Sequence, residues 1–272
     1  MQKTSIAYAD YSCNPIRFRR KDNGKMGHAC IKCSLQCLHC YSAVWNRRFG
    51  TGLPYDAESM KLVEPVLIKK ELDALERAKG LVFVEDMSDL FGPFVPKEMR
   101  DAVLDVLCGN KKATFLLLTK WTGIMQKHLS QRWNNSGKIF TPPENIWIGV
   151  TYTGEKSVND LLKTPAAVRW VSAEPLLESV DFEHMKFCNP LNDGYTFNAL
   201  KHGEFASINL VVVGCESGVG RRMCYTNWIR EIVEQCKRNE TACYVKQIDL
   251  GHAVTDNPAL FPSDIRVRDY PA

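Results

Sequence analysis

The sequence predicts an α/β protein in which parallel strands alternate with crossover helices. Short apolar runs rich in β-branched residues recur along the chain, which is typical of strands buried on both faces of a sheet. Amphipathic stretches separate several of these runs, and polar residues follow nearly every one. An open or closed α/β barrel is the first interpretation. A doubly wound flat sheet is the alternative, because periodicity alone does not separate the two.

Composition places the chain among ordinary globular proteins. Its 272 residues fit one large domain, and we expect a single domain over 1–272. No run approaches the roughly 18 apolar residues of a membrane helix, and the start lacks the apolar core of a signal peptide. We therefore expect a cytoplasmic protein with no membrane segment. Its 11 cysteines are odd in number and clustered, so they do not suggest a disulfide framework.

The amino-terminal part combines a short strand with a long basic loop. Residues 4–11 are predicted to form the first strand, and a turn follows at Cys13-Asn14-Pro15. Residues 16–29 are expected to form a loop that continues into the cysteines. We treat 13–41 as one basic, cysteine-bearing loop.

Two helical segments are expected next. The first covers 41–49 and ends at Gly50. The apolar spacing of 56–79 predicts a long helix that Pro65 divides or kinks.

The rest of the chain carries the regular alternation. Two inserts interrupt it: a small polar one at 130–145, and a long irregular connection at 181–207 that is typical of a lid or binding insert. The expected helices cover 96–108 and 225–239. The expected strands cover 81–85, 114–118, 146–150, 168–171, 208–213 and 242–245.

The cysteine loop carries the strongest chemical signal. Cys33, Cys37 and Cys40 are spaced C-x3-C-x2-C, which lets one loop hold three corners of an iron–sulfur cube and leave the fourth iron open. Zinc is the alternative, since Cys30 completes two C-x2-C pairs, with His28 or His39 as other ligands. Zinc ribbons usually separate such pairs by a dozen or more residues. The spacing therefore favours a cluster.

Polar residues at the carboxyl ends of the expected strands predict a functional site. A single such residue is more often a cap or a turn former, but the pattern repeats on six strands. The active sites of parallel α/β folds lie at this edge. Lys120 and Lys246 could neutralise a carboxylate or phosphate there, or reach solvent. The polar residues at the carboxyl ends of the expected strands are Asp86, Ser88, Thr119, Lys120, Thr151, Ser172, Glu174, Glu216, Ser217 and Lys246.

Basic residues surround the cysteines and suggest a polyanion partner. Arg47 and Arg48 follow the loop, near the aromatic residues Trp45 and Phe49, and Phe18 lies in the basic stretch before it. Clustered cations with aromatics are a common footprint of nucleic-acid binding, although a solvated basic loop is an equal alternative. The cations before the cysteines are Arg17, Arg19, Arg20, Lys21, Lys25 and Lys32.

The segment Cys33-Ser-Leu-Gln-Cys37-Leu-His-Cys40 resembles the cluster-binding motif of the radical S-adenosylmethionine (radical SAM) superfamily. The wider chain is similar to a family of phage and bacterial proteins with a three-cysteine motif, through Val171-Ser-Ala-Glu-Pro-Leu176 and Val213-Gly-Cys-Glu-Ser-Gly218 among other stretches. The resemblance implies a partial radical-SAM-type barrel. It also implies a [4Fe–4S] cluster on Cys33, Cys37 and Cys40, whose open iron binds S-adenosylmethionine (SAM).

The same resemblance implies roles for the strand-end residues. Many members of the superfamily bind the SAM amine with a Gly-Gly-Glu stretch after the second strand, and Asp86 or Ser88 occupies that place here. Cys30 is the alternative to Cys33 as the first cluster ligand. Lys120 and Lys246 are the candidate catalytic residues. The candidate cofactor-binding residues are Tyr41, Asp86, Ser88, Thr119, Thr151, Ser172, Glu174, Gly214 and Glu216.

The implied activity is the generation of a 5′-deoxyadenosyl radical from SAM, with an electron from an external donor. The expected substrate is a nucleic-acid base, or a nucleotide, that is modified or isomerised, with phage-type thymidine hypermodification in DNA as the concrete candidate. Two alternatives stay open. One is a non-catalytic, zinc- or cluster-bearing nucleic-acid-binding protein, and the other is a radical SAM enzyme that acts on a peptide or small metabolite.

Overall fold

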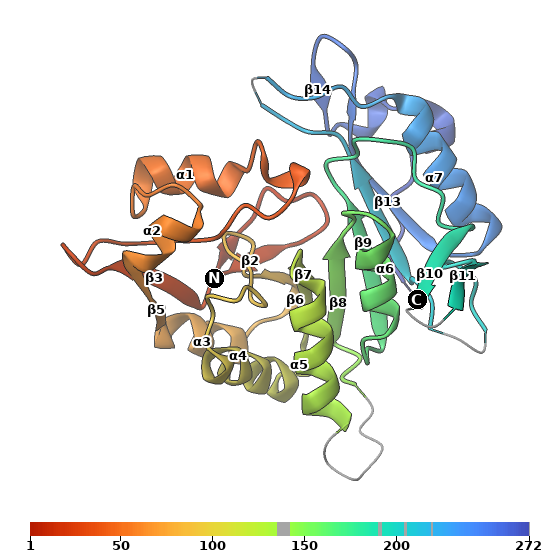
Figure 1. Cartoon of the computed structure of the whole chain (residues 1–272). Helices are drawn as coiled ribbons and strands as arrows, with labels where there is room; N and C mark the ends of the chain where they lie inside the picture. The colour runs from red at the N-terminus through yellow and green to blue at the C-terminus, as the bar shows by residue number, and fades with distance from the viewer. Residues whose placement is uncertain (135–141, 190–191, 204–205, 219, 272) are drawn as a thin grey trace.

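A nine-stranded sheet forms the centre of the protein in the computed structural model (Figure 1). The structure describes residues 1–134, 142–189, 192–203, 206–218 and 220–271. Seven consecutive strands, from β2 to β13 in the sheet, are parallel, and a short antiparallel strand stands at each end. In sheet order the strands are β1 (Gln2–Lys3), β2 (Tyr11–Cys13), β6 (Gly80–Val84), β7 (Ala113–Thr119), β8 (Ile146–Thr151), β9 (Val168–Ala173), β12 (Leu210–Gly214), β13 (Ala242–Asp249) and β14 (Val254–Thr255).

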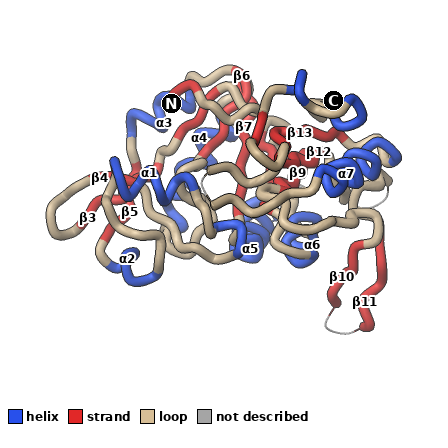
Figure 2. The backbone as a smooth tube through the Cα atoms, turned by 90° about the horizontal axis from the view of Figure 1, so that it is seen from above, coloured by secondary structure: helices blue, strands red, loops and turns tan. Residues whose placement is uncertain are grey.

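The parallel strands follow one another in chain order without a reversal. A doubly wound sheet reverses its order at a switch point, so that alternative does not describe this protein. Right-handed crossovers in one direction place their helices on one face, and α5, α6 and α7 lie outside the strands in Figure 2. The helices are α1 (Tyr41–Phe49), α2 (Ala57–Lys61), α3 (Lys69–Glu76), α4 (Lys97–Gly109), α5 (Thr122–Asn134), α6 (Glu155–Leu162) and α7 (Thr226–Arg238).

Both faces of the parallel sheet are buried, which explains its continuous apolar runs. Alternate strand residues such as Val82 and Val84 pack in the core shared with the helices, while Phe83 between them joins a smaller cluster on the inner face. The ring of Tyr8 lies about 6 Å from Phe83 on β6, Trp170 on β9 and Tyr244 on β13. Because one ring reaches three strands that are not neighbours, the sheet curves around it.

A glycine makes room for the largest residue of this inner cluster. Gly149 on β8 pairs with Trp170 on β9. A Cβ at Gly149 would lie 2.3 Å from the indole ring of Trp170, far inside van der Waals contact. The tryptophan therefore needs glycine on the neighbouring strand.

A second, three-stranded antiparallel sheet corrects two predictions. Its order is β4 (Met26–Gly27), β3 (Ile16–Arg20) and β5 (Val63–Leu67), so residues 16–29 are not all loop. The segment 56–79 does contain two helices, α2 and α3, but Pro65 lies in a strand between them and not at a simple break or kink. Ile16 and Phe18 are buried and alternate with arginines, the period-two pattern of a half-buried strand. Pro65 fits β5 because this is an edge strand, where a missing N–H is tolerated.

Other expected boundaries shift. The first strand is not 4–11, because most of that segment is a turn between β1 and β2. The 181–207 connection contains a hairpin of β10 (Met185–Asn189) and β11 (Asn192–Phe197). Residues 130–134 of the expected polar insert belong to α5, and 135–141 lie outside the described residues. Short 3-10 helices are η1 (Leu35–Cys37), η2 (Pro258–Leu260) and η3 (Ser263–Ile265). Within the described ranges, we find no helix with the length and apolar content of a membrane span.

Candidate functional site

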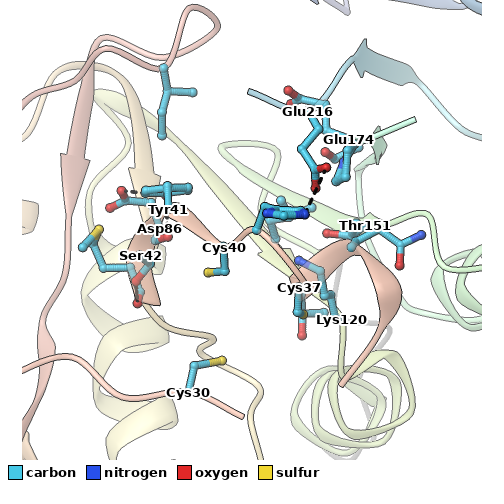
Figure 3. Close-up of a pocket in the computed structure, with 18 of the residues that line it drawn as sticks. Cys30, Cys37, Cys40, Tyr41, Ser42, Asp86, Lys120, Thr151, Glu174 and Glu216 are labelled. Carbon is cyan, nitrogen blue, oxygen red and sulfur yellow. Dashed lines mark hydrogen bonds and ion pairs between the residues drawn. The ribbon is translucent and has the colours of Figure 1, made fainter. Parts of the chain in front are cut away.

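One cavity lies at the carboxyl ends of the parallel strands, and the cysteine loop forms part of its wall (Figure 3). Its volume of about 230 Å³ exceeds what a single water molecule needs. Gly214 is absent from the lining, although it lies directly behind Glu174. The predicted residues that line the cavity are Cys33, Cys37, Cys40, Tyr41, Asp86, Ser88, Thr119, Lys120, Thr151, Ser172, Glu174, Glu216 and Lys246.

All four cysteines of the loop carry free thiols and line this cavity. Cys37 is buried and Cys33 is exposed. A hydrogen bond from the Cys33 thiol lowers the pKa of Cys37 to about 4. Lys120 favours the same thiolate. The side chain of Gln36 donates to the carbonyl oxygen of Tyr152 at 3.0 Å and so ties the loop to the end of β8.

The four thiols share a cavity and are not gathered at one point. Within the described ranges, no three His, Cys, Asp or Glu side chains lie closely enough to share one metal ion. A tetrahedral zinc site requires four donors about 2.0–2.3 Å from one point, whereas a cluster takes its cysteines at separate iron atoms. Cys30 lines the same cavity as Cys33, so both are candidates for the first ligand of a metal centre.

Asp86 and Ser88 follow β6 and have structural partners. Asn14 donates to Asp86 Oδ1 at 2.7 Å, and the hydroxyl of Tyr41 donates to the Asp86 carbonyl oxygen at 2.7 Å and to Oδ2 at 3.2 Å. Ser88 donates to the carbonyl oxygen of Ala29 at 2.7 Å. Burial raises the pKa of Asp86 despite these bonds. The tyrosine therefore joins the start of α1 to the end of β6.

Glu85 is a site residue for which the sequence carried no signal beyond its place in a strand. It is the residue after β6, its φ is 61°, and its side chain is almost fully buried in the cavity wall. Oε1 accepts from the amide of Ile16 at 2.6 Å, but Oε2 has no partner among the described residues. Burial raises the pKa of Glu85 far above its usual range. A strained, unpaired carboxyl at a cavity is a common mark of a functional position.

Lys120 is held at the cavity by a buried carboxylate. Asp89 accepts from the Thr119 hydroxyl at 2.7 Å and from the Lys120 amide at 3.0 Å. The Thr119 hydroxyl is thereby used in fixing the strand end. Among the described residues, the ammonium of Lys120 has no ion-pair partner within 4.0 Å, and it lies near Cys37 (Figure 3). It is a cation beside the cysteines rather than part of a salt bridge.

Glu174 and Lys246 form an ion pair on the opposite side of the cavity. The Lys246 ammonium lies 2.7 Å from Glu174 Oε1 and 5.9 Å from the centre of the Tyr8 ring. Both side chains are largely buried. The pair presents a fixed positive and a fixed negative charge, which suits a zwitterionic group such as an amino acid.

Glu216 links the cysteine loop to the segment after β12. Arg222 donates to it through its main-chain amide at 2.9 Å and through the Nε and Nη2 atoms of its guanidinium, and His39 Nε2 lies 3.9 Å away. Burial opposes ionisation, but the hydrogen bonds from Arg222 lower the pKa of Glu216. Sequence reasoning misses Arg222, because it lies six positions after Glu216 and well beyond the strand end at Gly214.

The hydroxyls of Thr151 and Ser172 line the cavity from β8 and β9. In the described part of the chain neither side chain takes part in a hydrogen bond. Both are buried, so they can bond to a ligand at little cost. Tyr8 was also unforeseen, and it lines the cavity together with Phe83 from the inner cluster.

Three of the six cations before the cysteines, the arginines, have a carboxylate within 4.0 Å. Arg19 lies 2.6 Å from Glu64, and Arg20 pairs with Asp22. Arg17 contacts His28 Nε2 at 2.6 Å and lies 3.9 Å from Glu71. The expectation that Phe18 lies at a nucleic-acid surface is wrong, because its side chain is fully buried under β5. Among the described residues, Lys21, Lys25 and Lys32 are in no ion pair, so the lysines are the cations of this stretch that a polyanion could meet.

Comparison with protein families gives a match over most of the chain. A family model described as "Protein of unknown function (DUF5131)" matches residues 3–258. No curated protein and no solved structure matches the chain.

Proposed function

The chain belongs to the DUF5131 family, and we propose that it is a radical SAM enzyme that holds a [4Fe–4S] cluster on Cys33, Cys37 and Cys40. The single observation that carries the proposal is the cavity itself. The three cysteines of the C-x3-C-x2-C loop share it with polar side chains at the carboxyl ends of six parallel strands, β6, β7, β8, β9, β12 and β13. A cofactor bound at the cysteines would therefore be in reach of both lysines and both glutamates.

When bound, such a cluster with SAM on its open iron supplies reductive cleavage of SAM and a 5′-deoxyadenosyl radical. The protein's own residues bind, orient and exclude water. The Glu174–Lys246 pair offers a carboxylate to the methionyl amine and an ammonium to the methionyl carboxylate. The hydroxyls of Thr151 and Ser172, which line the cavity, would bond to the ribose. Asp86, fixed by Tyr41 and Asn14, is a second acceptor for the amine.

For the substrate we propose a nucleic-acid base or nucleotide that is modified or isomerised, with a thymine in DNA as the specific candidate. The supports are the resemblance of the cysteine loop and the net charge of +4. A flipped base fits a cavity with aromatic walls, and Tyr8, Tyr41 and Phe83 line this one. A peptide or small metabolite is the alternative substrate. In that case we expect that added polyanions do not change the activity.

Anaerobic reconstitution tests the cofactor. We expect about four irons and four sulfides per chain, and formation of 5′-deoxyadenosine when SAM and dithionite are added. Cys37→Ala should abolish both. Cys108→Ala, on α4 and outside the cavity, should change neither. A chain that takes up zinc and no iron would support the non-catalytic alternative, and a fully loaded cluster that never cleaves SAM would refute the proposed activity.

A further inference from the structure

Helix α1 buries polar side chains and exposes apolar ones, the reverse of an ordinary surface helix. Its buried side chains are the polar Ser42 and Asn46, and Asn46 bonds to the main chain of the loops around it. Its apolar side chains face solvent, with exposed fractions of 69% for Val44, 41% for Trp45 and 57% for Phe49. A helix on a globular protein normally buries its apolar face. Exposed apolar residues gathered in one place indicate an interaction site.

The exposed apolar surface continues onto the cysteine loop. Leu35 and Leu38 in and after η1 are 74% and 55% exposed, and Leu38 lies between two of the candidate cluster ligands in sequence. We call Leu35, Leu38, Val44, Trp45 and Phe49 the loop–helix patch. Figure 1 shows α1 on the outside of the molecule, joined to the loop that crosses the carboxyl ends of the strands.

The charge beside this patch has one sign. Residues 31–49 contain Lys32, Arg47 and Arg48 but no aspartate or glutamate. Among the described residues, Arg47 and Arg48 are in no ion pair, whereas Arg19 and Arg20 nearby are paired. Arg48 instead lies over the ring of Phe49, 4.9 Å from its centre. An acidic partner would therefore find cations that no internal carboxylate neutralises.

We propose that the loop–helix patch docks an acidic electron-transfer protein that reduces the cluster, an inference that rests on the proposed function. An apolar centre with a charged rim is typical of a protein interface, and small interfaces of this kind suit transient redox encounters. Single-stranded nucleic acid fits less well, because Leu35, Leu38 and Val44 have no ring on which a base can stack. A carrier seated here would contact the outer surface of the loop whose cysteines hold the cluster.

The test compares two reductants on the cluster-loaded chain. A reduced plant-type [2Fe–2S] ferredoxin, an acidic carrier, must dock, whereas dithionite is small and need not. Stopped-flow bleaching of the cluster absorbance gives the rate for each. We expect Arg48→Glu and Val44→Glu to slow reduction by ferredoxin roughly tenfold or more at low salt and to leave reduction by dithionite unchanged.

Matched variants separate the patch from general surface effects. Lys127→Glu changes an exposed cation on α5, and Leu260→Glu changes an apolar residue of similar exposure on η2. Both should behave as wild type with either reductant. Equal ferredoxin rates in wild type, Arg48→Glu and Val44→Glu would overturn the proposal while the dithionite data left the proposed function standing. If the chain takes up no cluster during reconstitution, the proposed function itself is refuted, before any docking is measured.

Two other occupants of the patch give distinct results. If the patch binds nucleic acid, Arg48→Glu and Val44→Glu will weaken binding of a single-stranded oligonucleotide and leave reduction by ferredoxin unchanged. If a second copy covers the patch, the wild-type chain will be a dimer in sedimentation analysis and Val44→Glu a monomer. Either result would overturn the assignment to an electron carrier.

Discussion

The ammonium of Lys246 on β13 lies 2.7 Å from a carboxylate oxygen of Glu174, which follows β9. Strand β12 lies between those two strands in the sheet, so the ion pair spans its end. Gly214 is the last residue of β12, and a Cβ there would lie 3.0 Å from the same Glu174 oxygen. A side chain at this position would crowd the carboxylate that meets Lys246.

Gly214→Val should therefore weaken SAM binding. The added methyl groups would displace Glu174 from Lys246 and from the methionyl amine, and a lost charge-assisted hydrogen bond corresponds to roughly a ten- to hundredfold loss of affinity. Calorimetric titration of the cluster-loaded chain with SAM measures it. Gly109→Ala, at a glycine with open space around it, should leave the affinity unchanged. Wild-type affinity in Gly214→Val would show that the ion pair has no part in binding.

Lys120→Met should shift the reduction potential of the cluster to a more negative value. The cation near Cys37 stabilises the reduced, more negative state, and local charge is one determinant of cluster potentials. Lys120→Arg keeps the charge and should lie close to wild type. A redox titration followed by electron paramagnetic resonance measures the shift. Identical potentials in the Met and Arg variants would exclude an electrostatic role.

Arg222→Met should destabilise the fold. Glu216 is buried, and its carboxylate would lose the guanidinium that holds it. A buried polar group left without its partner costs about 1–3 kcal/mol. Denaturant unfolding of the variant measures the loss. The double variant Arg222→Met/Glu216→Gln removes the orphaned charge as well and should recover part of the stability; no recovery would mean that Arg222 acts through other contacts.

His28→Gln should flatten the acid dependence of stability. Burial first, and then the charge of Arg17, lower the pKa of His28 to about 3. Between its unfolded value of 6.5 and pH 3, the unfolded chain binds a proton that the folded chain does not. Wild type therefore loses stability as the pH falls through this window, by about 1.4 kcal/mol for each pH unit.

Urea unfolding between pH 7 and pH 4 measures this dependence. Glutamine keeps an acceptor for Arg17 but cannot take up the proton, so the variant should lose less stability on acidification. His252→Gln, at an exposed histidine, should follow wild type. Parallel curves for wild type and His28→Gln would mean that His28 does not govern acid sensitivity.

The parallel strands, and the edge of the sheet where the cavity lies, could be predicted from the sequence. A strand buried on both faces is visible as a short apolar run, and the polar residues that follow the run mark its carboxyl end. Thirteen of the fourteen predicted site residues line one cavity. For those at strand ends this follows from the parallel order of the strands, whereas the cysteines and Tyr41 reach the cavity from the loop that crosses it. Lys120 and Glu174 are far apart in sequence, yet each directly follows a strand.

The antiparallel sheet could not be predicted with the same rule. Arg17 and Arg19 made β3 read as a basic loop, although Ile16 and Phe18 alternate with them. In β5 the apolar spacing of 56–79 matched a helix, and only pairing with β3 decides the outcome. Tertiary contacts overrode local pattern there. The left-handed backbone of Glu85 likewise has no sequence signature, since such a conformation is rare for any residue but glycine.

The Tyr8 ring has one more consequence. With Phe83, Trp170 and Tyr244 it packs into one cluster inside the curved sheet. Tyr8 and Phe83 also line the cavity, so two rings of this cluster form part of its wall. A ligand bound there would rest on side chains of the hydrophobic interior. A substitution deep in that cluster, at Trp170 for example, would then act on the ligand through Tyr8 and Phe83 without touching it.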